Sequence, residues 1–157
     1  MSLYSILDEL NISYERIEHE PVFTVEDARI IKDKLSGVGC KNLFLKAGRV
    51  EDYILVVLDE RKRADLRLIA RLANVSRLSF AGRDELYEIL RLYPGAVSPF
   101  GIIYDRENRV RIIIDSDLEG KTLLLHPNVN TATLAVRYDD FIKFLDYNGR
   151  RYATAKL

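Results

Sequence analysis

The chain has few of the residues from which disulfides and metal centres are built. Its 157 residues include one cysteine and two histidines. One cysteine excludes an intrachain disulfide, and with two histidines it forms no cluster at the spacing of a zinc site. We therefore predict no structural metal site and no cofactor.

Long apolar runs and an excess of one charge are also absent. No apolar run approaches the roughly 18 residues of a membrane-spanning helix, and no secretory-type segment opens the chain. Lys plus Arg and Asp plus Glu number 24 each, so the chain lacks the broad basic excess that holds nucleic acid by charge alone. We expect a soluble cytoplasmic protein in which any RNA contact is local.

What the chain does have is ample apolar material for a core, since 48% of its residues are hydrophobic. Its length fits one compact domain, and no linker, repeat or low-complexity stretch divides it. We predict a single domain over residues 1–157.

Helical and strand patterns mix along the chain. Apolar spacing and capping residues predict helices over 3–10 after Ser2, 24–35 after Thr24, 65–73 after Asp65, 84–92 and 138–147. β-forming runs predict strands over 41–46, 53–58, 77–80, 102–104, 110–114, 122–125, 133–137 and 152–155.

The turns between these runs suggest how the strands pair. A glycine turn at 47–49 predicts a hairpin between the first two long strands, and Asp/Asn/Gly turns predict an antiparallel meander over 102–137. Helices mixed with mostly antiparallel strands favour the α+β class over a doubly wound parallel sheet.

Three polar signatures interrupt the β-forming runs. They are Cys40-Lys41-Asn42-Leu43-Phe44-Leu45, Pro94-Gly-Ala-Val-Ser-Pro-Phe-Gly101 and His126-Pro-Asn-Val-Asn-Thr131. Each places a cation, a flexible corner or an imidazole where packing would favour an apolar residue. We expect the three segments to meet in one pocket.

In these segments the chain resembles the YbaK/ProRS-associated family of aminoacyl-tRNA editing domains, in particular free-standing Ala-tRNA(Pro) deacylases. Lys41 matches the family lysine, Gly95-x-x-x-Pro99 its glycine loop, and His126-Pro-x-x-Asn130-Thr131 its late histidine segment. His19-Glu20-Pro21 resembles the early His-x-Pro segment. The resemblance covers nearly the whole chain, and its specificity lies in three matches in the right order.

The resemblance implies a partly barrel-like, mixed and mostly antiparallel sheet with helices around it. It also implies an activity, the hydrolysis of a mischarged aminoacyl-tRNA ester, with alanine on tRNA(Pro) as the first candidate. The expected partners are the tRNA acceptor end and prolyl-tRNA synthetase or an elongation factor, with no membrane. A deacylase for Cys-tRNA(Pro) or another small aminoacyl-tRNA, and a non-catalytic module that binds tRNA or a synthetase, are the alternatives.

The resemblance also gives these residues roles, each with a structural alternative. Lys41 would hold the phosphate or ribose of the acceptor end, or else reach water from a strand end. The glycine loop would present backbone N–H groups to the ester carbonyl, or simply connect a helix to a strand. His126 would position the substrate or act as a base, or bond to a turn carbonyl.

The remaining candidates are weaker. Asn130 and Thr131 would bind ribose or fix the turn, His19 would lie at the pocket mouth or in solvent, and capping already explains Thr24. The candidate catalytic residues are Lys41, Gly95, Ser98, Pro99, Gly101 and His126, and the candidate substrate-binding residues are His19, Thr24, Asn42, Phe100, Asn130 and Thr131.

Three other features are interpreted as structural. Cys40 has no recognisable catalytic partners and is predicted to be a small buried filler. The mixed charges of 59–63 and the pair Arg150-Arg151 are predicted to be solvated surface. Contacts of Lys62, Arg63 and Arg67 with acceptor-stem phosphates are the alternative for the first cluster.

Overall fold

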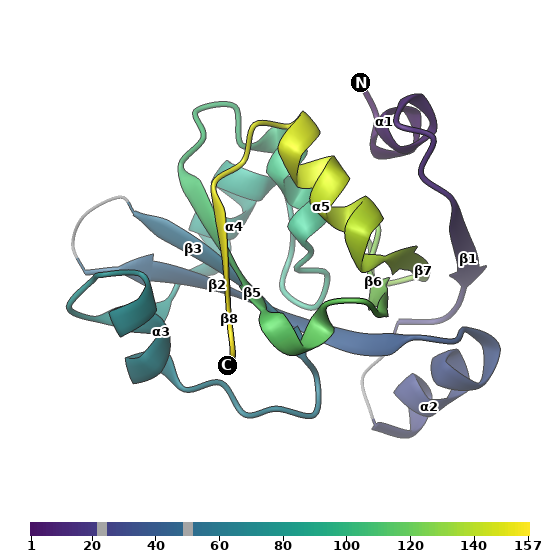
Figure 1. The fold of residues 1–157 in the computed structure, drawn as a ribbon, viewed down its shortest axis with the longest axis horizontal. Helices are drawn as coiled ribbons and strands as arrows, with labels where there is room; N and C mark the ends of the chain where they lie inside the picture. The colour runs from purple at the N-terminus through teal and green to yellow at the C-terminus, as the bar shows by residue number, and fades with distance from the viewer. Residues whose placement is uncertain (22–24, 49–51) are drawn as a thin grey trace.

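The computed structural model describes residues 1–21, 25–48 and 52–157. Its helices are α1 (Leu3–Glu9), α2 (Val25–Lys34), α3 (Leu66–Leu72), α4 (Arg83–Leu90) and α5 (Tyr138–Tyr147), with 3-10 helices η1 (Pro99–Tyr104) and η2 (Ser116–Leu118). Its strands are β1 (Tyr14–Glu18), β2 (Val38–Ala47), β3 (Tyr53–Asp59), β4 (Leu78–Phe80), β5 (Val110–Asp115), β6 (Thr122–Leu125), β7 (Ala132–Arg137) and β8 (Tyr152–Ala155) (Figure 1).

The strands form one mixed sheet in the order β1-β7-β6-β2-β3-β5-β8, with β4 added to β2. The long strand β2 joins its two halves, because Val38 and Gly39 pair parallel with β6 while the rest of β2 pairs antiparallel with β3. The pairs β1/β7, β6/β7, β2/β3 and β2/β4 are antiparallel, and β2/β6, β3/β5 and β5/β8 are parallel. The α+β class with a mixed, mostly antiparallel sheet is confirmed.

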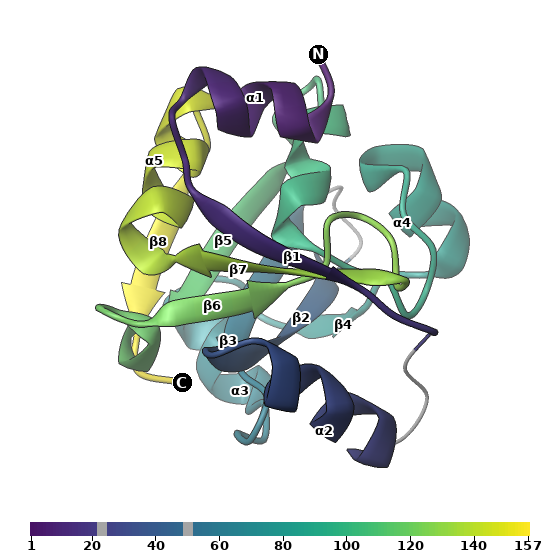
Figure 2. The ribbon, with the colours of Figure 1, turned by 90° about the vertical axis from the view of Figure 1, so that its right-hand side faces the viewer.

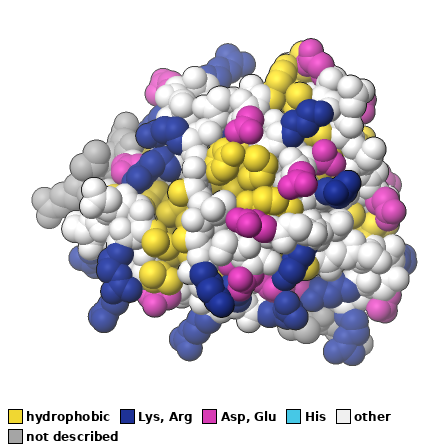
Figure 3. Space-filling model, viewed as in Figure 1, with side chains coloured by type: hydrophobic (Ala, Val, Ile, Leu, Met, Phe, Trp, Pro, Cys, Tyr) yellow, Lys and Arg dark blue, Asp and Glu magenta, His cyan; other side chains and the backbone are white. Residues whose placement is uncertain are grey.

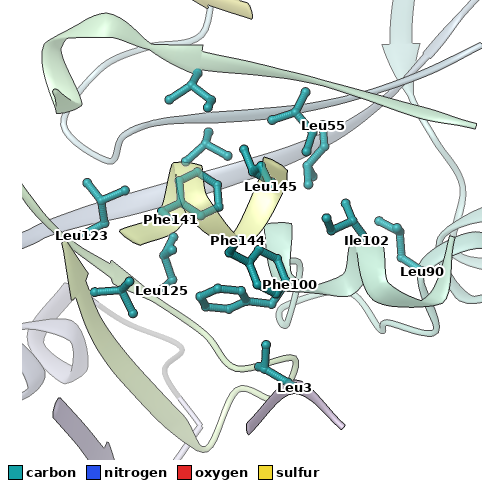
Figure 4. Close-up of a cluster of buried hydrophobic side chains, with 14 of the residues drawn as sticks. Leu3, Leu55, Leu90, Phe100, Ile102, Leu123, Leu125, Phe141, Phe144 and Leu145 are labelled. Atoms are coloured by element: carbon teal, nitrogen blue, oxygen red, sulfur yellow. The ribbon is translucent and has the colours of Figure 1, made fainter. Parts of the chain in front are cut away.

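The largest core lies on the face of the sheet that α1, α4 and α5 cover. Phe100 of η1 is fully buried there and packs edge-on against Phe141 and Phe144 of α5, with ring centroids 6.3 and 5.1 Å away (Figure 4). Ile112 of β5 and Leu134 of β7 belong to the same cluster although three strands separate them in the sheet. The sheet therefore curves around this core.

The opposite face carries α2 and α3, which lie on the same side of the sheet in Figure 2. Ile69 of α3 packs with Leu45 and Ile54, and Leu35, just after α2, packs with Leu124. Because both faces are covered, every residue of β3 is buried.

Most helices begin and end where the sequence predicts. Ser2 and Asp65 accept hydrogen bonds from the first turns of α1 and α3, and α5 spans the predicted range. The predicted hairpin is present as the β2/β3 pair. Thr24, predicted to cap α2, lies outside the described residues.

The predicted meander over 102–137 is confirmed only for its last two strands, β6 and β7, which pair antiparallel, and is wrong for its first two. Residues 102–104 belong to η1, because Ser98 caps the helix and Pro99 begins it. Strand β5 pairs parallel with β3 and β8, and its apolar residues are buried on both faces, as an interior parallel strand requires. The sequence analysis also missed β1, whose charged residues suit an edge strand.

Charges of both signs are interspersed on the surface, as Figure 3 shows for one face. Within the described ranges, no helix combines the length and the apolar content that crossing a bilayer requires.

Candidate active site

Ser98 joins the glycine loop to the late histidine segment. Its Oγ donates a hydrogen bond to the carbonyl oxygen of His126 at 2.6 Å and accepts one from the N–H of Phe100 at 3.1 Å. The residue is fully buried, so solvent does not compete for these bonds. The hydroxyl thus caps η1 and fixes the loop against the end of β6, which makes Ser98 a positioning residue in this structure.

His126 is held as a neutral imidazole. Its Nδ1 lies 3.1 Å from the carbonyl oxygen of Ala132, which can only accept, so Nδ1 carries the hydrogen and Nε2 is an acceptor. Burial lowers the pKa of His126. The hydrogen bond to Ala132 raises this pKa, and a positive charge on His19, when that ring is protonated, lowers it. The ring can therefore orient a hydroxyl or a water through Nε2.

His19 joins the early segment to the same place. Its Nδ1 lies 2.8 Å from the carbonyl oxygen of Glu20 and its Nε2 lies 2.8 Å from Oγ1 of Thr133, so the hydroxyl donates to the ring. The His19 N–H donates to the carbonyl oxygen of Thr131 at 2.9 Å. The His19 and His126 ring centroids are 6.3 Å apart. The structure therefore brings the two histidines together.

The corner of the glycine loop faces Asn130. Gly95 has a φ of +91°, which favours glycine, and a Cβ built on it would lie 3.9 Å from Nδ2 of Asn130. The loop and the late histidine segment are thus neighbours at two points, Gly95 with Asn130 and Ser98 with His126.

A small cavity of about 100 Å³ opens beside His126. Its lining comes from α2, β2, β6, β7 and the end of β3, and consists of Ile31, Lys32, Gly39, Cys40, Glu60, Leu124, Leu125, His126 and Thr133. Lys32 and Glu60 form an ion pair between α2 and the end of β3. A Cβ on Gly39 would collide with the Glu60 carboxylate, so a larger residue there would make the Glu60 side chain move.

Cys40 lines this cavity but is not a nucleophile. Burial, with the charges of Asp59 and Glu60, raises the pKa of its thiol to about 12. A thiol with that pKa remains protonated at neutral pH, and only the thiolate attacks carbonyls. Cys40 is half-buried and packs against the main core, so the predicted role as a small buried filler is confirmed only in part.

Lys41 and Asn42 follow Cys40 along β2 with their side chains on opposite faces. Lys41 pairs with Leu58 and is half-buried, and its ammonium makes no hydrogen bond or ion pair with any described residue. The structure records no contact between that ammonium and the described residues of the loop or His126. The Asn42 Oδ1 is buried and has no hydrogen-bond partner among the described residues. Neither Lys41 nor Asn42 is among the residues that line the cavity.

Three loop residues support the site from the core and do not line the cavity. Pro99, Phe100 and Gly101 are buried, and Phe100 belongs to the main core. A Cβ on Gly101 would lie 2.7 Å from Cδ1 of Leu92, so a larger residue would force the Leu92 side chain or the loop to move. Thr131 is exposed beside His19, and Thr24 lies outside the described residues.

The sequence analysis missed two residues of this site. Thr133, which bonds to His19, looks like an ordinary strand residue because threonine forms strands well. Glu60 stands in a charged run of the kind that is usually solvated. A buried strand threonine opposite a histidine segment is a signal that appears only once the β1/β7 register is known.

The predictions for two charged residues, Arg150 and Lys62, also change. Arg150 is not solvated: its side chain is 8% exposed and donates to the carbonyl oxygens of Ile102 and Asp105 at 2.7 Å each, which fixes the end of η1. Lys62 is tied to Asp115 and Asp117 at 2.9 and 2.6 Å, so a phosphate would have to displace those carboxylates.

Comparison with known proteins identifies the family. The sequence profile of the family described as the aminoacyl-tRNA editing domain matches residues 19–144, a span that contains every signature segment. The chain belongs to this family. Prolyl-tRNA editing protein ProX from Acetoanaerobium sticklandii is 38% identical to this editing domain over 152 residues, which cover 96% of the chain and 93% of that protein.

Other relatives agree. Prolyl-tRNA synthetase associated domain-containing protein 1 from Danio rerio is 35% identical over 147 residues, covering 92% of the chain and 79% of that protein. The crystal structure of a candidate trans-editing enzyme for prolyl tRNA synthetase matches with a TM-score of 0.72 at 18% identity, covering 99% of this chain and 94% of that one. At that identity the structure supports the fold alone.

Family membership confirms the predicted family, fold and class of activity. The editing domain is an aminoacyl-tRNA deacylase that acts in the editing of mischarged tRNA.

Proposed function

We propose that the whole chain works as one free-standing domain that removes alanine from tRNA(Pro). The observation that carries the proposal is the Ser98 bond, which joins the glycine loop to His126 beside a cavity of about 100 Å³. Pockets for drug-sized ligands measure about 300 to 1,000 Å³, so a cavity this small suits the methyl group of alanine. The name of the relative ProX supports tRNA(Pro) as the carrier.

The loop offers two donors for the carbonyl oxygen of the ester. The N–H groups of Ala96, Phe100 and Gly101 are used within the loop and its flanks, and proline has none. The N–H groups of Gly95, Val97 and Ser98 donate to no described residue. Ser98 is fully buried, whereas Gly95 is exposed and Val97 is half-buried, so Gly95 and Val97 are the candidate donors to the ester oxygen.

The reaction is attack by water on the ester carbonyl. Negative charge develops on the carbonyl oxygen and is stabilised by the loop N–H groups. The bond from the carbonyl carbon to the ribose oxygen then breaks, and the leaving oxygen takes up the proton that the water has lost. Alanine and free tRNA are the products.

The substrate itself supplies the proton acceptor in this mechanism. The Cys40 thiol is protonated and the Ser98 hydroxyl is buried and engaged twice, so neither serves as a nucleophile. The ribose hydroxyl next to the ester is held in place by the site and relays the proton. His126 orients that hydroxyl or the water through Nε2, and Lys41 holds a phosphate of the acceptor end.

Amino acid release from a panel of esters tests this proposal. Ala-tRNA(Pro), Cys-tRNA(Pro) and Pro-tRNA(Pro) are compared, together with Ala-tRNA(Pro) that ends in a 2′-deoxyadenosine. We expect fast release of alanine, slow release of proline and a large loss of rate without the neighbouring hydroxyl. Release of cysteine alone would show that the substrate is Cys-tRNA(Pro) and not Ala-tRNA(Pro). Full activity on the deoxy substrate would contradict the proton relay by the ribose hydroxyl.

A non-catalytic tRNA-binding module is the second candidate. The balanced charge of the chain supports this candidate, because a chain without a basic excess binds tRNA weakly by charge. A partner such as prolyl-tRNA synthetase or an elongation factor would then supply part of the affinity for tRNA. Binding of tRNA without turnover of any ester would establish it.

A further inference from the structure

Three exposed side chains form a continuous surface at the end of α4. Tyr87 is 44% exposed and Tyr93 is 61% exposed, and their ring centroids lie 5.4 Å apart. The guanidinium carbon of Arg91 lies 5.3 Å from the centroid of the Tyr87 ring. We call these three residues the Tyr87/Arg91/Tyr93 surface. Tyrosine rings this exposed leave much apolar area in contact with water, and covering that area with a binding partner would be favourable in free energy.

Arg91 occupies a backbone conformation that does not suit it. It ends α4 with a φ of +56°, a place where glycine is usual. The other non-glycine residues with positive φ in the described ranges are all asparagines, namely Asn11, Asn74, Asn108 and Asn128. Asparagine tolerates this region, whereas arginine is strained there. Within the described part of the chain, the Arg91 guanidinium forms no ion pair that would offset the strain.

The surface adjoins the candidate active site. Tyr93 lies two residues before Gly95, and its carbonyl oxygen accepts a hydrogen bond from the N–H of Ala96 at 3.0 Å. Gly95 in turn faces Asn130. In Figure 2, α4 and the loop between β6 and β7 lie on the same side of the molecule. A strand whose terminal ester lies at the glycine loop therefore has this surface beside it.

The chemistry of the surface fits single-stranded RNA. Bases stack on aromatic rings and on guanidinium planes, and a guanidinium also meets phosphate. Tyrosine and arginine are common in protein interfaces as well. The position next to the loop favours RNA, because the substrate of the editing domain is itself a nucleic acid and the chain has no broad basic excess to hold it elsewhere.

We propose that the Tyr87/Arg91/Tyr93 surface stacks the unpaired nucleotides that precede the terminal adenosine of the tRNA. This proposal rests on the proposed function, since it assumes that the ester end lies at the glycine loop. The rings hold the strand by its bases, and Arg91 adds one phosphate contact. The surface then supplies affinity for any tRNA 3′ end, while the cavity selects the amino acid.

Binding of an uncharged acceptor-stem minihelix tests the proposal directly. The dissociation constant is measured for minihelices with and without the unpaired 3′ nucleotides. Loss of one stacked base corresponds to a roughly 5- to 150-fold weaker complex. We expect Tyr87→Ala and Tyr93→Ala each to weaken binding by such a factor only when the 3′ nucleotides are present. The phenylalanine variants should bind like the wild type, because they keep the ring.

The Arg91→Gly variant distinguishes an RNA-binding role of Arg91 from a structural one, because the two roles predict different effects on stability and on minihelix binding. Removing the strained side chain should raise the urea midpoint of unfolding, while the binding of the minihelix weakens and its dependence on log salt falls by about one unit of slope. Tyr152→Ala, at an exposed tyrosine on the edge strand β8, is the matched control and should leave binding unchanged.

Two substrates separate this proposal from the proposed function. Hydrolysis is measured on Ala-tRNA(Pro) and on the alanyl ester of adenosine, which lacks the preceding nucleotides. Loss in the tyrosine variants that is larger for tRNA than for the small ester supports the surface. If the tyrosine variants hydrolyse both esters and bind the minihelix as the wild type does, the stacking proposal is overturned. The exposed rings would then be a surface for a protein partner. A wild-type chain that binds the 3′ end but hydrolyses neither ester refutes the proposed function alone.

Discussion

Replacing Ser98 with alanine should both destabilise the fold and slow deacylation. The substitution removes the hydroxyl that donates to the His126 carbonyl oxygen and accepts from the Phe100 N–H. Both partners then lose a hydrogen bond inside the protein, where water does not replace it. The glycine loop also loses its link to the end of β6.

The expected loss of stability follows from these two bonds. A buried hydrogen bond contributes about 1 kcal/mol net, and a lost helix cap costs about 1 kcal/mol. The sum, about 2 kcal/mol, is roughly a 30-fold change in the unfolding equilibrium. For a domain of this size it lowers the melting temperature by about 4 to 8 °C.

Urea unfolding and deacylation kinetics measure the two effects. The Ser98→Ala variant should unfold at lower urea with an unchanged slope, and kcat for alanine release should fall while some activity remains. Ser79→Ala, at an exposed serine of β4, is the matched control. Wild-type stability together with complete loss of activity would refute this reasoning, because that result marks a nucleophile and not a positioning residue.

Three further predictions concern the fold around the site. The Tyr53 hydroxyl lies 2.5 Å from the Glu85 carboxylate and, with the Lys46 ammonium, lowers the pKa of that carboxyl to about 2 from 4.5. The stability that this contact contributes is present above pH 4.5 and is lost as the pH falls toward 2. Glu85→Gln should therefore cost about 1 to 3 kcal/mol at pH 7 and make the stability measured in urea titrations depend less on pH in the acid range. Gly101→Ala should destabilise by about 1 to 3 kcal/mol, since its Cβ would meet Leu92, and a melting temperature equal to the wild type would contradict that overlap. The lowered pKa of His126 means that the unfolded chain binds its proton more readily, so wild-type stability should fall as pH drops below 6.5, and His126→Asn should remove that part of the pH dependence.

The sequence predicted the elements whose signals are local. Ser2 and Asp65 mark their helices because a capping side chain acts within one turn. The pairing of β5 was not predictable in this way, because its partners β3 and β8 are distant in the chain. In η1, the β-forming residues 102–104 were overridden by the Ser98 cap and the fixed φ of Pro99.

The site was predictable only in part for a related reason. The glycine loop and the histidine segment were expected to meet, and the Ser98 bond to His126 shows that they do. The neighbours Arg150 and Arg151 look alike in the sequence, yet Arg150 is buried because Asp105 and the end of η1 are folded against it. Such a difference depends on a distant partner, which no local pattern contains.

The rate of alanine release from Ala-tRNA(Pro) by the wild-type chain and by Lys41→Ala tests the central proposal most directly. Lys156→Ala, at an exposed lysine near the end of the chain, is the matched control. The proposed mechanism predicts release far above the spontaneous rate, a loss of roughly 100-fold in kcat/KM for Lys41→Ala and no change for the control. Release no faster than the spontaneous rate, or equal release by Lys41→Ala, would contradict it.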